Sequence, residues 1–153
     1  MSIFQTRILL ATDGSQQAEL AARTAVDIAA TTNSELHMVT VARLEYAHAY
    51  DIPESGDVQK SAYGAIERKA RELLDKQVKK IEQTGGPIPQ EVHLLRGYPD
   101  REIVHLADEI GAGLIVMGNR GQGEVRKALM GSVSNSVVRY AHCPVLIVRE
   151  EKR

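Results

Sequence analysis

The chain has 153 residues, 43% hydrophobic and 25% charged, and a formal net charge of -1; these are ordinary globular values, so we expect one domain over residues 1–153. The charge excludes the basic footprint of a nucleic-acid-binding protein, and the apolar runs are too short to cross a membrane. A single cysteine, Cys143, excludes an internal disulfide, and together with the absence of a signal peptide it predicts a cytoplasmic protein.

The first half of the chain alternates strand and helix patterns. Residues 8–11 form a continuous apolar run, typical of a strand buried on both faces, and residues 13–15 supply a turn and a helix cap. Alanines at helical spacing follow, and residues 35–41 are predicted to form a second strand. Residues 42–60 lack a clean period and are predicted to form a long loop.

The second half continues the alternation. A helix is predicted from Ser61 to the glycines before Pro87, and residues 91–96 alternate as a half-exposed edge strand does. Pro99 suits the first turn of a helix that Gly111 closes. Apolar runs at 114–117 and 145–148 predict two more strands, with a helix over 132–140 between them. Five strands and four helices in this order predict an α/β fold with a parallel sheet covered on both faces.

A glycine-rich segment lies between the strand at 114–117 and the helix at 132–140. It reads Gly118-Asn119-Arg120-Gly121, then nine residues, then Gly131-Ser132-Val133-Ser134. Glycines at a strand end let backbone N–H groups approach an anion, and a helix N-terminus adds further donors and a favourable dipole. We interpret the segment as a phosphate site, with an ordinary turn-forming loop as the alternative.

The two commonest phosphate motifs are excluded in this segment. Glu124 stands where a Walker A loop has its lysine, and Arg126 stands where a dinucleotide fingerprint has its third glycine. Arg120 lies within the loop and could pair with a phosphate through two hydrogen bonds.

Histidines give no sign of a metal site in the sequence. His37, His93 and His105 occur one per predicted element, without the spacing of metal ligands. We therefore expect them to be structural or surface residues.

With these features, the chain resembles the universal stress protein family over nearly its whole length. The resemblance rests on residues 8–15 and 118–148; the latter contain the pattern G-x-x-G, nine residues, G-S, filled by Gly118, Gly121, Gly131 and Ser132. Some members of that family bind ATP, and the glycine pattern of this chain is similar to theirs. The resemblance implies a single-domain, doubly wound, five-stranded parallel sheet of order 3-2-1-4-5 with helices on both faces. In such a sheet, ligands bind where the strand order reverses, between strands 1 and 4.

The resemblance implies an ATP site, with Mg²⁺, in that crevice. Val41 would offer backbone groups to the adenine. The triphosphate would be surrounded by Gly118, Gly121, Gly131, Ser132, Val133 and Ser134. Asp13 keeps two interpretations of equal weight: a turn or cap residue, or a ligand of a ribose hydroxyl or, through water, of nucleotide-bound Mg²⁺. The implied binding residues are Ala11, Thr12, Asp13, Val41, Met117, Gly118, Arg120, Gly121, Gly131, Ser132, Val133 and Ser134. No catalytic residue is predicted.

The resemblance further implies a regulatory role in a stress response, through nucleotide-dependent assembly or partner binding. The alternative is a slow ATP hydrolase or nucleotide-transferring enzyme of the same α/β class. The sequence has no evident base beside the loop and no Walker lysine, so we expect at most a weak ATPase. A third hypothesis is a flavin-binding module on a related fold.

A homodimer is the last expectation. In the implied strand order, the apolar strand at 145–148 lies at a sheet edge, and an exposed apolar edge promotes aggregation unless it is covered. The resemblance suggests that the same strand of a second copy covers it about a two-fold axis. The dimer would depend on Val145 and Ile147 or on Leu146 and Val148, according to which face is buried.

Overall fold

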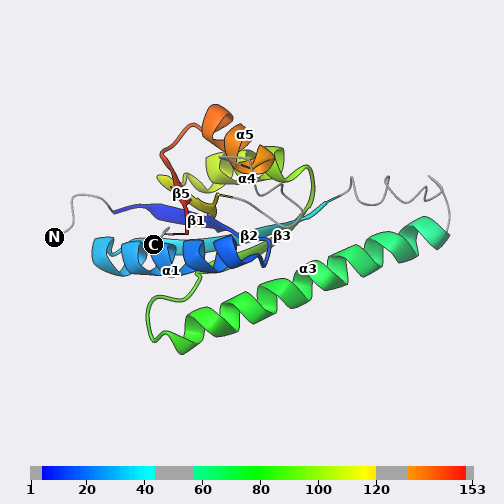
Figure 1. Cartoon of the computed structure of the whole chain (residues 1–153), viewed down its shortest axis with the longest axis horizontal. Coiled ribbons are helices and arrows are strands. Elements are labelled where there is room, and N and C mark those ends of the chain that lie inside the picture. Colours follow the sequence, from blue (N-terminus) through cyan, green and yellow to red (C-terminus); the bar gives the residue numbers. More distant parts are fainter. Residues whose placement is uncertain (1–4, 44–56, 120–130, 151–153) are drawn as a thin grey trace.

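The computed structural model describes residues 5–43, 57–119 and 131–150, with side chains from residue 62 onward in the second range. Five strands form one parallel sheet of order β3-β2-β1-β4-β5, which confirms the predicted fold (Figure 1). Along the chain the elements are β1 (Arg7–Ala11), α1 (Gln16–Thr32), β2 (Glu35–Arg43), α3 (Asp57–Gln83), β3 (Glu91–Gly97), α4 (Pro99–Ile110), β4 (Leu114–Gly118), α5 (Ser132–Tyr140) and β5 (Val145–Val148).

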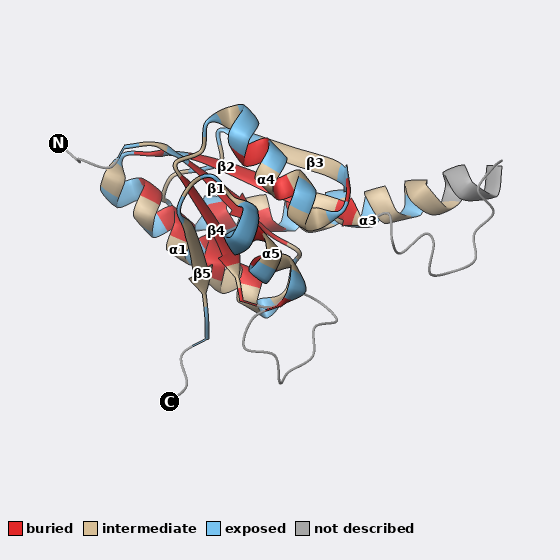
Figure 2. Cartoon of the chain, turned by 90° about the horizontal axis from the view of Figure 1, so that it is seen from above, coloured by how far each residue is buried: buried red, intermediate tan, exposed pale blue. Residues whose placement is uncertain are grey.

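Helices cover both faces of the sheet. In Figure 1, α1 and α3 lie below the sheet, and α4 and α5 lie above it. Two apolar clusters fill these layers: one joins Ile8, Leu10 and Val116 to the alanines of α1, and the other joins Leu9 and Ile115 to α4 and α5. The central strands β1 and β4 are buried on both faces, as Figure 2 shows, because their apolar residues do not alternate with polar ones.

Local signals set the start of α1 and both ends of α4 as predicted. The Ser15 hydroxyl accepts a hydrogen bond from the Ala18 N–H at 3.2 Å, which caps the start of α1. Pro99 occupies the first turn of α4, and Gly111 ends that helix with a φ of 66°, a left-handed conformation that glycine adopts without strain. Among the described residues, no helix is both long enough and apolar enough to cross a membrane.

Two boundaries differ from the sequence prediction. β2 continues through Arg43, and α3 begins at Asp57 rather than at Ser61, so the predicted loop at 42–60 is too long at both ends. Residues 57–60 carry no apolar period, but the hydrogen bonds of a helix are local, so a helix can extend beyond its packed face. In β2, the pairing of Ala42 with Arg96 extends the strand past its apolar stretch. The remainder of that loop lies outside the described residues.

Candidate functional site

One pocket lies at the carboxyl ends of β1, β2 and β4. This is the point at which the strand order reverses, since β1 connects through α1 to β2 on one side and β4 connects through α5 to β5 on the other. Nine of the predicted binding residues line it: Ala11, Thr12, Asp13, Val41, Met117, Gly118, Gly131, Val133 and Ser134. Ser132 is exposed and is not part of the lining, while Arg120 and Gly121 lie outside the described residues.

Threonines fix the ends of β1 and β2 at this pocket. The Thr40 hydroxyl donates to the Thr12 carbonyl at 2.6 Å, and the Thr12 N–H donates to the Val39 carbonyl at 3.0 Å. Both threonines are buried. Sequence analysis missed Thr40, although its place between two valines of a predicted strand marks a polar side chain inside the sheet.

Asp13 forms a turn immediately after β1. The Ser15 N–H donates to Asp13 Oδ1 at 2.9 Å, which is the local bond expected of an aspartate that precedes a helix. This bond uses one of about four acceptor positions on the carboxylate. The turn interpretation is therefore confirmed, and it leaves the ligand interpretation open because the same side chain lines the pocket.

Gly118 is a glycine because α1 packs tightly against the end of β4. A Cβ atom added to Gly118 would lie 2.8 Å from Gln17 Cβ and 2.9 Å from the Gln17 carbonyl carbon. Such distances require the helix to shift, since one of the two atoms is backbone. Helix packing alone thus explains Gly118, and a phosphate is not needed to account for it.

The start of α5 lacks the acidic residues that the first turns of α1 and α4 hold. Its N-cap residue, Gly131, makes no side-chain capping bond, and its first turn holds no acidic residue. Gly131 has a φ of -70° and a ψ of 161°, which any residue can adopt, so the backbone does not require glycine here. Backbone N–H groups and the positive end of the helix dipole at this place favour an anion.

Ser134 joins α5 to the end of β4. Its buried hydroxyl donates to the Asn119 carbonyl at 2.9 Å or to the Gly131 carbonyl at 3.1 Å, and the Gly131 N–H donates to the Asn119 carbonyl at 2.8 Å. A hydroxyl has a single proton to donate. In this arrangement the Ser134 hydroxyl joins the start of α5 to the end of β4, a structural role that the sequence does not predict.

Removing the Ser134 hydroxyl should have a modest effect on stability. Both carbonyls keep a backbone donor in Ser134→Ala, since the Asn135 N–H donates to Gly131 and the Gly131 N–H donates to Asn119. We expect the free energy of unfolding to fall by about 1 kcal/mol, or about 2–4 °C in melting temperature for a chain of this size. Thermal unfolding monitored by circular dichroism measures this, and an unchanged melting temperature would show that the bond is not stabilising.

Arg43 is a further lining residue that sequence analysis missed. It is the last residue of β2 and lines the pocket from the end of that strand. The sequence predicts a loop at this position, because a strand is recognised by its apolar positions and Arg43 lies at the end of one. A cation directly after a buried strand is the signal that could have identified it.

Histidines do come together, at the opposite end of the sheet. His37 on β2 and His93 on β3 lie beside Glu91, contrary to the expectation that they are scattered. Burial lowers the pKa of His93, and the nearby His37 lowers it further against the opposing effect of Glu91. Hydrogen bonds with His37 and then Arg7 hold the pKa of Glu35, beside His37, below its usual value. The register that joins these strands cannot be derived from sequence spacing.

A family model and curated relatives match almost the entire chain. The model of the "Universal stress protein family" matches residues 5–149. Universal stress protein MJ0531 of Methanocaldococcus jannaschii is 33% identical over 147 residues, covering 96% of this chain and 84% of its own length. A putative universal stress protein of Staphylococcus aureus strain USA300 is 36% identical over 146 residues, with coverages of 95% and 84%.

Solved structures share the fold. Hypothetical protein MJ0577 superposes with a TM-score of 0.81 at 23% identity, over 96% of this chain and 97% of its own. A universal stress protein in complex with cAMP gives a TM-score of 0.60 at 30% identity, covering 94% and 95% of the two chains. A universal stress protein from Archaeoglobus fulgidus in complex with dAMP gives 0.63 at 25% identity, covering 95% and 98%.

Proposed function

The chain belongs to the universal stress protein family, and on this basis we propose that it binds an adenine nucleotide, ATP with Mg²⁺, in the pocket at the carboxyl ends of β1, β2 and β4. The start of α5 carries the proposal: an uncapped helix N-terminus, free of acidic residues in its first turn, borders this pocket at Gly131 and Val133. Similar proteins in complex with cAMP and dAMP support the class of ligand.

The base would lie against β2. The Val39 carbonyl accepts a bond from the Thr12 N–H, directly after β1, and alternate residues of a strand direct their backbone groups to the same side. Val41 therefore directs its N–H and C=O past the end of β1, whose register with β2 ends at the pair Ala11 and Val39. These groups can bond the edge of an adenine, and the apolar side chains of Ile103 and Met117 line the same pocket.

Magnesium fits this pocket as part of the nucleotide. Asp13 is the one carboxylate among the lining residues that the structure describes. Mg²⁺ in nucleotide sites keeps several waters and is held by one or two carboxylates together with the phosphates. Asp13 would hold the ion through water or bond a ribose hydroxyl, and the ion would neutralise charge on the triphosphate.

The Asp13→Ala variant should distinguish the contribution of Asp13 from that of the backbone donors. We expect Mg-ATP to bind roughly 3–10-fold more weakly, because backbone donors at the start of α5 would supply most of the affinity, at roughly 1.5–3 kcal/mol per bond to a charged acceptor. Titration calorimetry with and without Mg²⁺ measures the change, and the magnesium dependence should decrease in the variant. Asn is the matched control, since Asp13→Asn keeps a side-chain acceptor for the Ser15 N–H. Complete loss of binding in Asp13→Asn would contradict a phosphate-centred site.

Regulation would act through assembly. The Ile115 N–H donates to the Pro144 carbonyl and the Asn119 N–H donates to the Val148 carbonyl. Val145 and Ile147 therefore direct their backbone groups to the outer edge of the sheet. All four residues of β5 are half-buried, with Leu146 and Val148 on one face and Val145 and Ile147 on the other. Both faces are thus partly covered within the chain, and a second copy would pair with the edge through its backbone. Because β5 follows α5 directly, nucleotide at the start of α5 would bias this homodimer or a partner in a stress response.

A further inference from the structure

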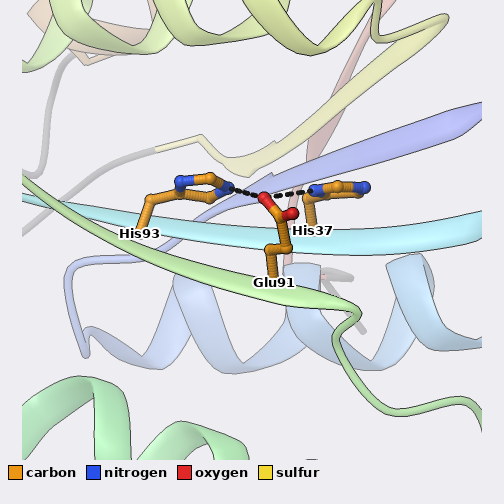
Figure 3. A group of neighbouring side chains, drawn as sticks. All are labelled: His37, Glu91 and His93. Carbon is orange, nitrogen blue, oxygen red and sulfur yellow. Dashed lines mark ion pairs between the residues drawn. The ribbon is translucent and has the colours of Figure 1, made fainter.

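Two histidines and a glutamate form a cluster at the amino-terminal end of the sheet (Figure 3). His37 lies on β2, and Glu91 and His93 lie on β3, where the register pairs His37 with Glu91. One ring nitrogen from each histidine and one Glu91 carboxylate oxygen all lie within 4.8 Å of one another. None of these three residues lines the nucleotide pocket.

The proton position on His37 follows from its neighbour. Its Nε2 lies 3.4 Å from Glu35 Oε2, and Glu35 also accepts a bond from Arg7 Nε at 3.0 Å. An ionised carboxylate only accepts, so His37 Nε2 is the atom that carries the proton. In the neutral ring the other nitrogen, Nδ1, then presents a lone pair. This atom is buried, has no hydrogen-bond partner in the described structure, and lies 4.0 Å from Glu91 Oε2.

His93 presents a second nitrogen to the same point. Its Nε2 is buried, has no hydrogen-bond partner in the part of the chain that the structure describes, and lies 3.4 Å from Glu91 Oε2. Figure 3 shows the carboxylate of Glu91 between the two rings, and the rings are nearly parallel, with an interplanar angle of 15°. Buried polar atoms ordinarily have a hydrogen-bond partner. Here two buried ring nitrogens without such a partner lie close to one carboxylate oxygen, so that three electron-pair donors converge.

We propose that His37, Glu91 and His93 bind a divalent transition-metal ion, Zn²⁺. Zinc bonds of about 2.0–2.2 Å in a tetrahedron place ligand atoms about 3.3–3.6 Å apart. Glu91 Oε2 lies 3.4 and 4.0 Å from the two nitrogens, close to this spacing. Two imidazoles favour zinc over the hard cations Mg²⁺ and Ca²⁺. The Glu91 side chain is 61% exposed, which gives the ion a route from solvent. Three protein ligands leave a fourth tetrahedral position for water.

Glu35 also supports the assignment of a zinc site, although it is not itself one of the three ligands. Metal-binding histidines commonly donate their second ring N–H to a carboxylate, which orients the ring and raises its basicity. The pair of His37 Nε2 and Glu35 has this arrangement. A bound ion would connect β2 to the edge strand β3, about 13 Å along β2 from Val41 at 3.3 Å per residue, so zinc and nucleotide would occupy separate sites.

Titration of Zn²⁺ into chelator-washed full-length protein tests the proposal by calorimetry. We expect one Zn²⁺ per chain in the wild type, and a loss of affinity of about 100-fold or more in Glu91→Gln and in His93→Gln. Glu35→Gln, which removes the orienting carboxylate and its ion pair with Arg7 but no ligand atom, should weaken binding by roughly 10–100-fold. His105→Ala removes an exposed histidine outside the cluster and should bind as the wild type does. Mg²⁺ should give no binding heat at this site.

Glu91 is exposed, so its glutamine variant should fold, and unchanged circular dichroism verifies this. The proposal would be overturned if Zn²⁺ up to about 1 mM gives no binding heat with the wild type. Equal affinity in the wild type and Glu91→Gln would also overturn it, and would leave the cluster as a pair of histidines that share protons with a carboxylate.

Discussion

Mg-ATP at about 100 times its dissociation constant should stabilise the wild-type chain by roughly 2.7 kcal/mol, and Gly131→Val should abolish this effect. For a chain of this size the stabilisation corresponds to a rise in melting temperature of about 5–10 °C. Gly131 is buried at the pocket, and its backbone conformation is open to any residue. Valine therefore adds bulk beside the start of α5 without straining the backbone, and we expect that bulk to take the space of the phosphates.

Gly64→Val is the matched control for this experiment. A Cβ atom added to Gly64 meets nothing within 4 Å, and the residue lies in α3, away from the pocket lining. This variant should keep the full nucleotide-induced shift. Gly118→Val is unsuitable, because its clash with Gln17 would disturb α1 whether or not a phosphate binds. A folded Gly131→Val variant with an undiminished shift would refute the phosphate interpretation of this helix start.

Ile147→Pro should convert a homodimer into a monomer. Proline lacks the N–H that Ile147 directs to the outer edge, and it is tolerated on edge strands where that N–H would face away from the sheet. The bonds to β4 are made by the neighbouring residues, as the Pro144 and Val148 carbonyls show, so the sheet within one chain should persist. In sedimentation equilibrium, we expect the mass to fall from about twice 16.8 kDa to 16.8 kDa.

Ile147→Val controls for the loss of side-chain volume, because it keeps the backbone donor and should remain dimeric. A wild-type chain that sediments as a monomer at micromolar concentration would contradict the proposed interface. A dimer that persists in a folded Ile147→Pro variant would instead place the interface on another surface.

The fold could be predicted because each element carries a local signal. The apolar run of β1 and the cap at Ser15 depend only on neighbouring residues, and so does the left-handed glycine that ends α4. The position of the pocket followed from the strand order that the family resemblance implied, since strand order determines which carboxyl ends are adjacent.

Contacts between distant segments could not be predicted in the same way. The meeting of His37 with His93 depends on the register of β2 and β3, which pairs residues more than fifty positions apart. The role of Ser134 depends on which carbonyls lie within reach of its hydroxyl, and that of Gly118 on how closely α1 approaches β4. A sequence pattern indicates which residue types such a position accepts. It does not identify the neighbouring atom that makes that residue type necessary.

An NMR titration of isotope-labelled protein with Mg-ATP tests nucleotide binding most directly, because backbone amide signals report both affinity and location. We expect saturable shifts concentrated in residues 11–13, at Val41 and in residues 131–134, with little change at His37 and His93. Spectra that remain unchanged at millimolar Mg-ATP, or shifts concentrated away from the carboxyl ends of β1, β2 and β4, would contradict the proposed site.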